Sequence, residues 1–224
     1  MTDDLTLHLT RAARYRALSL LFAPPDTRAA EELVALARDL DDPALRSLAA
    51  DADPDASGVY HSALGPTGAV RDSESDYEVN PLGGKGPLLA DVAGFYLALR
   101  YEDETLLGMS PDHISMELGF MGWLALRAAY ARREGEVEGE EVCVRASESF
   151  ARDHVGRWSP TFFARLRAAG EGSWYDRAAT YAQSALEALE PGRVSPPVVD
   201  RRRVALPTLD DSDDCGLPPD PATA

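Results

Sequence analysis

Cysteine is scarce in this chain of 224 residues, and long apolar runs are absent from it. The cysteines Cys143 and Cys215 form no C-x-x-C pair, so the sequence predicts no disulfide framework. No run approaches the roughly 18 apolar residues that a membrane-spanning helix needs. The N-terminus is acidic and amphipathic, and it lacks the pattern of a signal peptide. We therefore expect a soluble, cytoplasmic protein.

Basic residues are also far fewer than acidic ones. The net charge is −16 at pH 7, and Lys85 is the single lysine. A nucleic-acid-binding surface needs a positive field, so we expect no nucleic acid partner. An anionic membrane surface would repel the chain as well, and we expect no direct membrane insertion. A basic peptide, in contrast, would be attracted to this protein.

No stretch alternates in the manner of a β-strand, and apolar residues recur instead at helical spacing. Prolines and glycines divide the chain into predicted helices over residues 5–22, 27–40, 43–50, 87–101, 111–133, 140–156, 160–169 and 173–189. The stretch 51–86 is predicted to be a long, partly helical connection. We expect an all-α fold, a single-domain helical bundle over residues 1–190.

The composition changes at residue 191. Proline recurs, apolar residues thin out, and the basic cluster Arg201–Arg203 is followed by an acidic run over 210–214. Such a composition cannot bury enough apolar surface to order the chain. We predict a disordered, acidic, proline-rich tail over residues 191–224.

The most informative stretch covers residues 110–126 and has the sequence S-P-D-H-I-S-M-E-L-G-F-M-G-W-L-A-L. Ser110 suits a helix N-cap, and Pro111 suits the first helical position, where a missing N–H costs nothing. Asp112 then falls in the first turn, where its charge favours the helix dipole. The pattern predicts a helix that begins at Pro111.

The rest of this helix is nearly free of charge. His113 and Glu117 are four residues apart and so share one face, whereas residues 118–126 carry no charge at all. A helix that is apolar around most of its circumference is a central core helix. A carboxylate in such surroundings is rarely left unpaired, and we expect Glu117 to bond His113 or Arg127. The polar residues are either a structural cap or a functional site at a groove.

The segment P-D-H-I-x-x-E-L-x-F-M resembles the signature of the TorD/DmsD/NarJ family of molybdoenzyme assembly chaperones. Further segments resemble family elements in the same order, namely E-S-x-Y at 74–77, A-D-V-A-G-F-Y at 90–96 and F-x-x-D-H-x-x-x-W at 150–158. The order of these segments and the spacing between them agree with the family pattern over residues 10–190. The pattern is most similar to the branch that serves nitrate, chlorate and DMSO-type reductases, and it implies a helical bundle of the TorD-like type.

The resemblance implies a system-specific chaperone without catalytic residues. Such a chaperone binds the N-terminal or signal region of a molybdopterin oxidoreductase catalytic subunit. It then assists folding and cofactor insertion before export or membrane attachment. The residues predicted to bind the client or its twin-arginine signal are Asp112, His113, Pro111, Glu117, Tyr77, Tyr96 and Trp123.

The second motif is interpreted as mainly structural. Asp153 and His154 are predicted to lie within a helix, with Trp158 one turn after His154. We expect a polar bond between helices beside an aromatic core residue. Two Asp-His pairs invite the alternative of a metal-dependent helical hydrolase. The two residues of each pair are adjacent in sequence, however, so they do not present two metal ligands on one helical face. We therefore expect no metal. A generic helical adaptor is the other alternative.

Two further candidate sites, the glycine-rich loop at 83–86 and Cys143, lack the sequence pattern of a nucleotide site or a reactive thiol. The loop Gly83–Gly86 contains a lysine, but it lacks the G-x-x-x-x-G-K-[ST] spacing of a phosphate loop. We expect no stably bound cofactor. A transient contact with molybdopterin guanine dinucleotide or GTP is the alternative that the resemblance leaves open. Cys143 lies between Val142 and Val144 and is predicted to be a buried, inert thiol.

Overall fold

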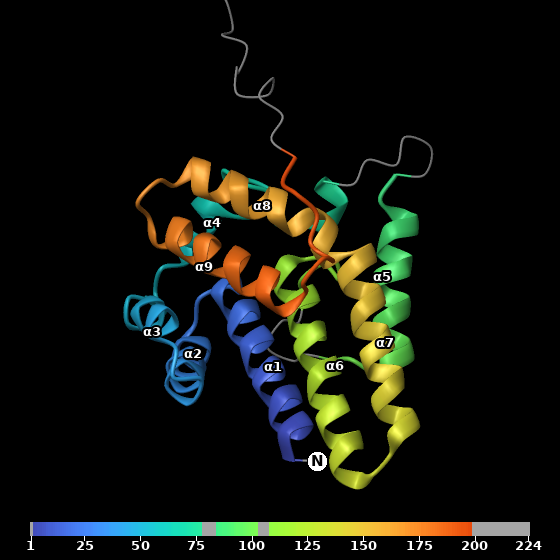
Figure 1. Ribbon diagram of the computed structural model, residues 1–224. Coiled ribbons are helices and arrows are strands. Elements are labelled where there is room, and N and C mark those ends of the chain that lie inside the picture. The colour runs from blue at the N-terminus through green and yellow to red at the C-terminus, as the bar shows by residue number, and fades with distance from the viewer. Residues whose placement is uncertain (1, 78–83, 103–107, 199–224) are drawn as a thin grey trace, which may run out of the picture.

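The computed structural model describes residues 2–77, 84–102 and 108–198, which form helices joined by turns (Figure 1). The helices are α1 (Thr2–Leu21), α2 (Thr27–Asp39), α3 (Pro43–Ala50), α4 (Ser57–Ala63), the short 3₁₀ helix η1 (Glu74–Asp76), α5 (Gly86–Leu99), α6 (Ile114–Glu134), α7 (Val137–Asp153), α8 (Val155–Ala169) and α9 (Trp174–Leu189). Within the described ranges, β pairing is limited to isolated bridges. The predicted all-α fold is confirmed.

Several helix ends follow directly from local chemistry. The side chain of Asp26 accepts the backbone N–H of Ala29 at 2.7 Å and so caps α2. Asp42 caps α3 in the same way, with Pro43 at the first helical position. Gly135 ends α6 in the left-handed conformation, with φ at +77°.

The helices pack around α6. In Figure 1, α1, α6, α7 and α5 stand side by side, α8 and α9 lie across the upper ends of α1 and α6, and α2 packs on α1 with α3 beyond it. Glycines on α6 allow α1 to approach closely. A Cβ on Gly119 would lie 2.3 Å from the Tyr101 hydroxyl and 3.3 Å from Ser19 Oγ, and one on Gly122 would lie 3.3 Å from the Ala12 carbonyl oxygen.

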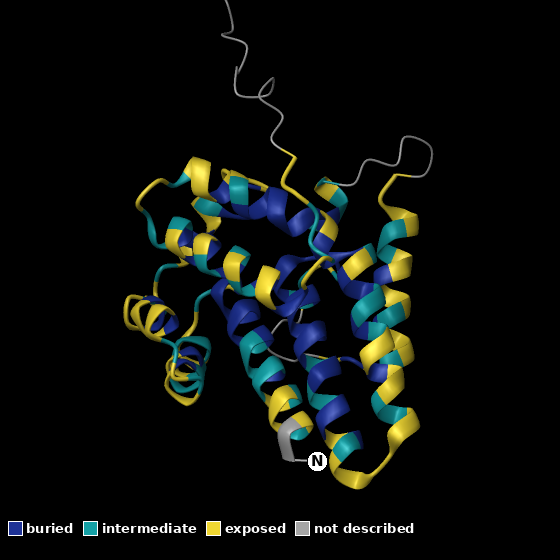
Figure 2. Cartoon of the chain, in the orientation of Figure 1, coloured by how far each residue is buried: buried dark blue, intermediate teal, exposed yellow. Residues whose placement is uncertain are grey.

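Burial confirms that α6 is the central core helix. Figure 2 shows α6 buried along most of its length, whereas α2 and α3 are buried on one face only. An aromatic cluster fills the space between α5, α6 and α7. Phe120 contacts Tyr96 and Phe150 at ring-centroid distances of 4.8 Å each, and Phe95 contacts Phe150 at 5.3 Å. This cluster supplies much of the apolar burial on that side of α6.

The start of α6 differs from the prediction. Helix α6 begins at Ile114, and its N-cap is His113, whose Nδ1 accepts the backbone N–H of Ser115 at 3.1 Å. Ser110 and Pro111 lie in the preceding turn, where the Ser110 hydroxyl donates to Asp112. The predicted cap was wrong because this turn bonds to a distant segment, residues 72–75.

The junction between α7 and α8 also differs. His154 is the single residue between the two helices, with φ −125° and ψ −99°, so it does not lie within a helix. Helix α8 then begins at Val155 and runs through Pro160. Proline lacks the N–H that would bond the Gly156 carbonyl. The backbone N–H of Ser195 takes its place at 2.8 Å, which explains why α8 starts before the proline.

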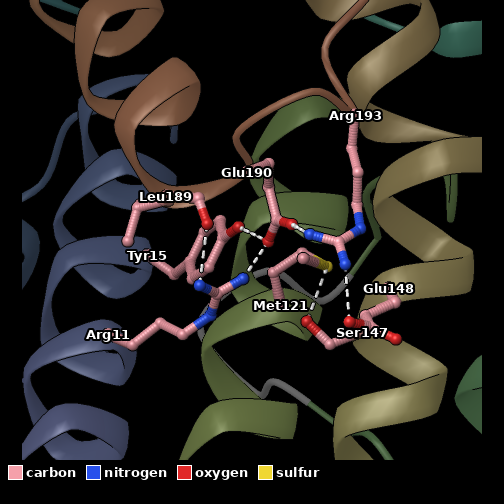
Figure 3. Close-up of polar contacts among 8 residues, drawn as sticks. All are labelled: Arg11, Tyr15, Met121, Ser147, Glu148, Leu189, Glu190 and Arg193. Atoms are coloured by element: carbon pink, nitrogen blue, oxygen red, sulfur yellow. Dashed lines mark hydrogen bonds and ion pairs between the residues drawn. The ribbon is translucent and has the colours of Figure 1, made fainter.

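The end of α9 is fixed by a buried carboxylate. Figure 3 shows Glu190 between Arg11 and Tyr15 of α1 on one side and Arg193 on the other. Arg11 also donates to the Leu189 carbonyl at 2.7 Å. Residues 191–198, the first part of the predicted tail, continue along α8. The remainder of that tail, 199–224, lies outside the described residues, and so does Cys215.

The predicted connection 51–86 contains α4 and η1. Its residues 78–83 are outside the described part of the chain. None of the helices that the structure describes combines the length and apolarity needed to cross a membrane.

Candidate functional site

A segment far from both Asp-His motifs in sequence lies between them in space. Residues 72–77 pair with the turn before α6. The Glu74 N–H donates to the Asp112 carbonyl at 2.9 Å, and the Ile114 N–H donates to the Asp72 carbonyl at 2.9 Å. The E-S-x-Y element, a minor feature of the sequence, is therefore the physical link between the two main motifs.

The first Asp-His pair holds this segment in place. Asp112 is 0 % exposed, and its carboxylate accepts the backbone N–H of Ser75 at 2.9 Å. His113 is 5 % exposed. Because its Nδ1 accepts from Ser115, the neutral ring carries its proton on Nε2, which lies 3.2 Å from Oδ2 of Asp72. In this structure neither side chain is presented to a partner, and their role in client contact stays a prediction.

Glu117 joins the first motif to the second. Its Oε2 accepts the indole N–H of Trp158 at 2.9 Å, and its carboxyl lies near that of Glu74. The partner is neither His113 nor Arg127. The guanidinium of Arg127 donates instead to the Leu99 carbonyl. Burial raises the pKa of Glu117 well above its usual range, and the nearby Glu74 carboxylate raises it further. Oε1 of Glu117 has no hydrogen-bond partner among the described residues, and a proton there would give Glu117 a donor toward the Glu74 carboxylate.

In the second Asp-His pair, His154 lies in the core and Asp153 lies at the surface. His154 is buried, and its Nδ1 lies 2.9 Å from Oε2 of Glu74. Its Nε2 lies 3.3 Å from Oδ2 of the exposed Asp91 on α5. Asp153 points outward and pairs with Arg152, whose hydrogen bond holds the pKa of Asp153 below its usual value. We call the connected residues the buried motif network, which comprises Asp72, Glu74, Asp112, His113, Glu117, His154 and Trp158.

The buried motif network is suited to positioning and not to catalysis on a partner. Its members are all buried, and most of their polar groups bond one another or backbone N–H groups, whereas Oε1 of Glu117 and Nε2 of His154 have no hydrogen-bond partner in the part of the chain that the structure describes. Connected hydrogen-bond networks of this kind stiffen a core and favour one arrangement. Here the network fixes η1, the start of α6 and the α7–α8 junction relative to one another. The mainly structural role of the second motif stays a prediction.

The predicted aromatic residues have different positions. The Tyr96 hydroxyl donates to the Pro111 carbonyl at 2.8 Å and so supports the turn before α6, while Pro111 itself is half-buried. Tyr77 stacks near Trp158 at 5.1 Å and lies under the guanidinium of Arg165. Trp123 lines an open groove of about 950 Å³ between α1, α2 and α6. Client binding by any of these side chains stays a prediction.

Metal and cofactor chemistry has little support among the described residues. These residues contain no group of three or more His, Cys, Asp or Glu side chains that could hold a metal ion. Lys85 is paired with Asp76 at 2.6 Å, and Gly83 lies outside the described residues, so a nucleotide contact at this loop stays a prediction. Cys143 is a buried free thiol, and burial raises its pKa, as its apolar neighbours predicted.

A second surface feature was missed by the sequence analysis. A groove of about 250 Å³ opens between the end of α1, helix α2, the α3–α4 connection and the start of α9. We call it the α2–α9 groove. Its walls are apolar, and among the described residues every charged side chain that lines it is an aspartate, namely Asp26, Asp51 and Asp53. No local pattern signals the groove, because its walls come from segments distant in sequence.

Comparison with known proteins agrees with the fold and with the motifs. The family model for the nitrate reductase delta subunit matches residues 23–164. A selenate reductase assembly chaperone of Thauera selenatis is 32% identical over 162 residues, which cover 70% of this chain and 77% of that protein. The crystal structure of a candidate redox enzyme maturation protein from Archaeoglobus fulgidus shares the fold. The TM-score is 0.50 at 19% identity, over 80% of this chain and 93% of that one. The predicted resemblance is confirmed, and this chain belongs to the nitrate reductase delta subunit family, a family of assembly chaperones and not of catalysts.

Proposed function

We propose that this protein is a cytoplasmic assembly chaperone for the catalytic subunit of a molybdopterin oxidoreductase of the nitrate or selenate reductase type. The observation that carries the proposal is the similarity to the selenate reductase assembly chaperone, which covers more than two thirds of both chains. In this proposal the protein binds the N-terminal or signal region of the unfinished subunit. It releases the subunit after the cofactor has been inserted, before export or membrane attachment.

The physical properties of the chain support reversible binding. A net charge of −16 attracts a basic segment and raises its rate of association. The buried motif network gives the helical body a fixed shape, so little ordering is needed when a partner docks. The proposed action requires no covalent step on the client, in keeping with a family of non-catalysts.

The alternatives from other functional classes have less support. A metal-dependent hydrolase would need a cluster of ligands that the described residues do not provide. In addition, Asp153 points to the surface while His154 points to the core, so the second pair does not act as one unit. A generic adaptor would bind a partner other than an oxidoreductase subunit, so only the identity of the partner distinguishes it from the proposed chaperone.

Affinity purification from the native host, followed by mass spectrometry, tests the proposal. We expect a molybdopterin oxidoreductase catalytic subunit as the main co-purifying protein, more abundant in cells that cannot make the cofactor. A matched purification with an unrelated acidic helical protein controls for charge alone. Capture of an unrelated partner, under conditions in which the oxidoreductase is expressed, would overturn the proposal.

A further inference from the structure

We infer that the α2–α9 groove is the docking site for a basic, apolar segment of the client subunit. This inference rests on the proposed function and names the surface at which it acts. The segment fits in helix-in-groove fashion, with apolar side chains on the floor and arginines at the rim.

The floor of the groove is apolar and is formed by residues that already belong to the core. Leu20 and Leu21 of α1 and Leu33 of α2 form its base and are buried. Trp174 at the start of α9 is half-buried, and its indole N–H is already occupied by the Leu48 carbonyl at 3.0 Å. A docked apolar side chain would therefore leave the indole N–H of Trp174 paired.

The rim carries negative charge that is available to a partner. Asp26 and Asp53 each use one oxygen to accept a local backbone N–H, from Ala29 and Asp55 respectively. Their other oxygens have no partner recorded in the structure, and both residues are exposed. An arginine of the client would form charge-assisted hydrogen bonds with these oxygens.

Asp51 is the third rim carboxylate and differs in being paired. Its Oδ2 bonds the guanidinium of Arg177 at 2.8 Å, with both side chains about half exposed. Exposed pairs of this kind are weak, so a client arginine could compete for the carboxylate. Charge complementarity thus favours a basic segment, and it disfavours an acidic peptide or a nucleic acid.

The size of the groove sets how the segment binds. A volume of about 250 Å³ is smaller than a typical pocket for a whole small-molecule ligand. It accommodates apolar side chains of a docked helix while the helix backbone stays outside. Val59 of α4 is 57 % exposed at the edge of the groove and extends the apolar surface on which such a helix would lie.

The test uses the full-length protein and a labelled synthetic peptide of twenty residues, with two adjacent arginines followed by leucines at helical spacing. Two matched peptides replace the arginines with glutamate or the leucines with serine. We expect the first peptide to bind at least tenfold more tightly than either matched peptide. Equal binding of all three would overturn the assignment of a basic, apolar ligand.

The groove is tested by the triple variant Asp26→Asn, Asp51→Asn and Asp53→Asn. Asparagine can still cap α2 and accept the local backbone N–H bonds, so the fold should be kept. A matched control removes three exposed carboxylates at the far α6–α7 hairpin, with the changes Glu134→Gln, Glu138→Gln and Glu141→Gln. We expect at least a tenfold loss of affinity in the groove variant and less than a twofold loss in the control. Equal losses would show attraction by net charge alone and would overturn the site.

A second variant tests the apolar wall without removing any carboxylate. Ala30 on α2 is partly exposed and lines the groove, so Ala30→Arg should fill it and oppose a basic ligand. We expect loss of peptide binding with an unchanged helical circular dichroism spectrum. Unchanged affinity in this correctly folded variant would overturn the site.

Capture of the client separates this inference from the proposed function. If the oxidoreductase subunit co-purifies equally with wild type and with both groove variants, the docking site is wrong and the chaperone function stands. If wild type captures no such subunit, the proposed function itself fails. The chain's own Arg201–Arg203 could compete for the groove. A tenfold gain in peptide affinity on replacing these arginines with glutamine would show that the tail and the client segment share the groove, which supports the assignment.

Discussion

The indole N–H of Trp158 donates to Oε2 of Glu117 across 2.9 Å, a bond between residues that stand 41 positions apart in the chain. Each residue belongs to a different Asp-His motif, and both are buried. Glu74 contacts both motifs, since its carboxyl lies against Glu117 and against His154. Three of the sequence motifs, at 74–77, 111–121 and 150–158, thus meet in the buried motif network.

Replacing Trp158 with phenylalanine should destabilise the protein. The change removes the N–H donor and leaves Oε2 of Glu117 unsatisfied in the core, at a cost of about 1–3 kcal/mol. The measurement is the free energy of unfolding in urea. Trp174→Phe is the matched control, because its acceptor is a backbone carbonyl beside a half-buried ring where water can substitute. An equal loss in both variants would contradict the role given to Glu117.

Glu117→Gln should make stability less dependent on pH. The folded-state pKa of Glu117 is raised, so its stabilising contribution is full below the ordinary glutamate pKa and is lost as pH rises toward the raised value. Glutamine does not ionise, and it can still accept from Trp158 and donate to Glu74. Urea midpoints between pH 5 and pH 8.5 should therefore fall more steeply for wild type than for the variant. Parallel curves would refute the raised pKa, and the exposed Glu141→Gln serves as control.

Gly156→Ala should loosen the packing of residues 191–198 on α8. A Cβ at this position would lie 2.4 Å from the carbonyl oxygens of both Ala151 and Arg193, so backbone must move. Overpacking of this kind costs about 1–3 kcal/mol. Thermal unfolding measures the loss, and limited proteolysis should cut earlier near residue 195. Gly94→Ala in α5 meets open space, and it should instead raise stability by up to about 1 kcal/mol.

Glu190→Ala should detach the end of α9 from α1. The change leaves Arg11, Tyr15 and Arg193 without their shared acceptor (Figure 3). Since the arginines are partly exposed and can turn to water, we expect a loss of about 2–3 kcal/mol and not the full cost of a buried charge. Chemical denaturation measures it. Glu187→Ala, one turn earlier on the exposed face of α9, should have little effect. A small loss at Glu190 as well would show that the cluster contributes little.

Much of the fold could be predicted from the sequence. The helical periodicity, the proline and glycine breaks and the uncharged run after Glu117 predicted the all-α fold and the central helix. The predicted start of α6 failed because Ser110 and Pro111 satisfy local cap rules while their turn bonds to residues 72–75. The predicted break before Pro160 failed because Ser195, a residue distant in sequence, supplies the hydrogen bond that proline cannot.

The sequence by itself determined the all-α class, the central helix, the family and the set of polar residues that matter, because periodicity and motif order are local properties of the chain. Only the tertiary structure decided where those residues point. Asp112 faces the core and Asp153 faces solvent, although each precedes a histidine, because residues 72–77 lie against one motif and against the histidine of the other. The α2–α9 groove is likewise a product of packing, since its walls come from four separate segments whose contact no local pattern encodes.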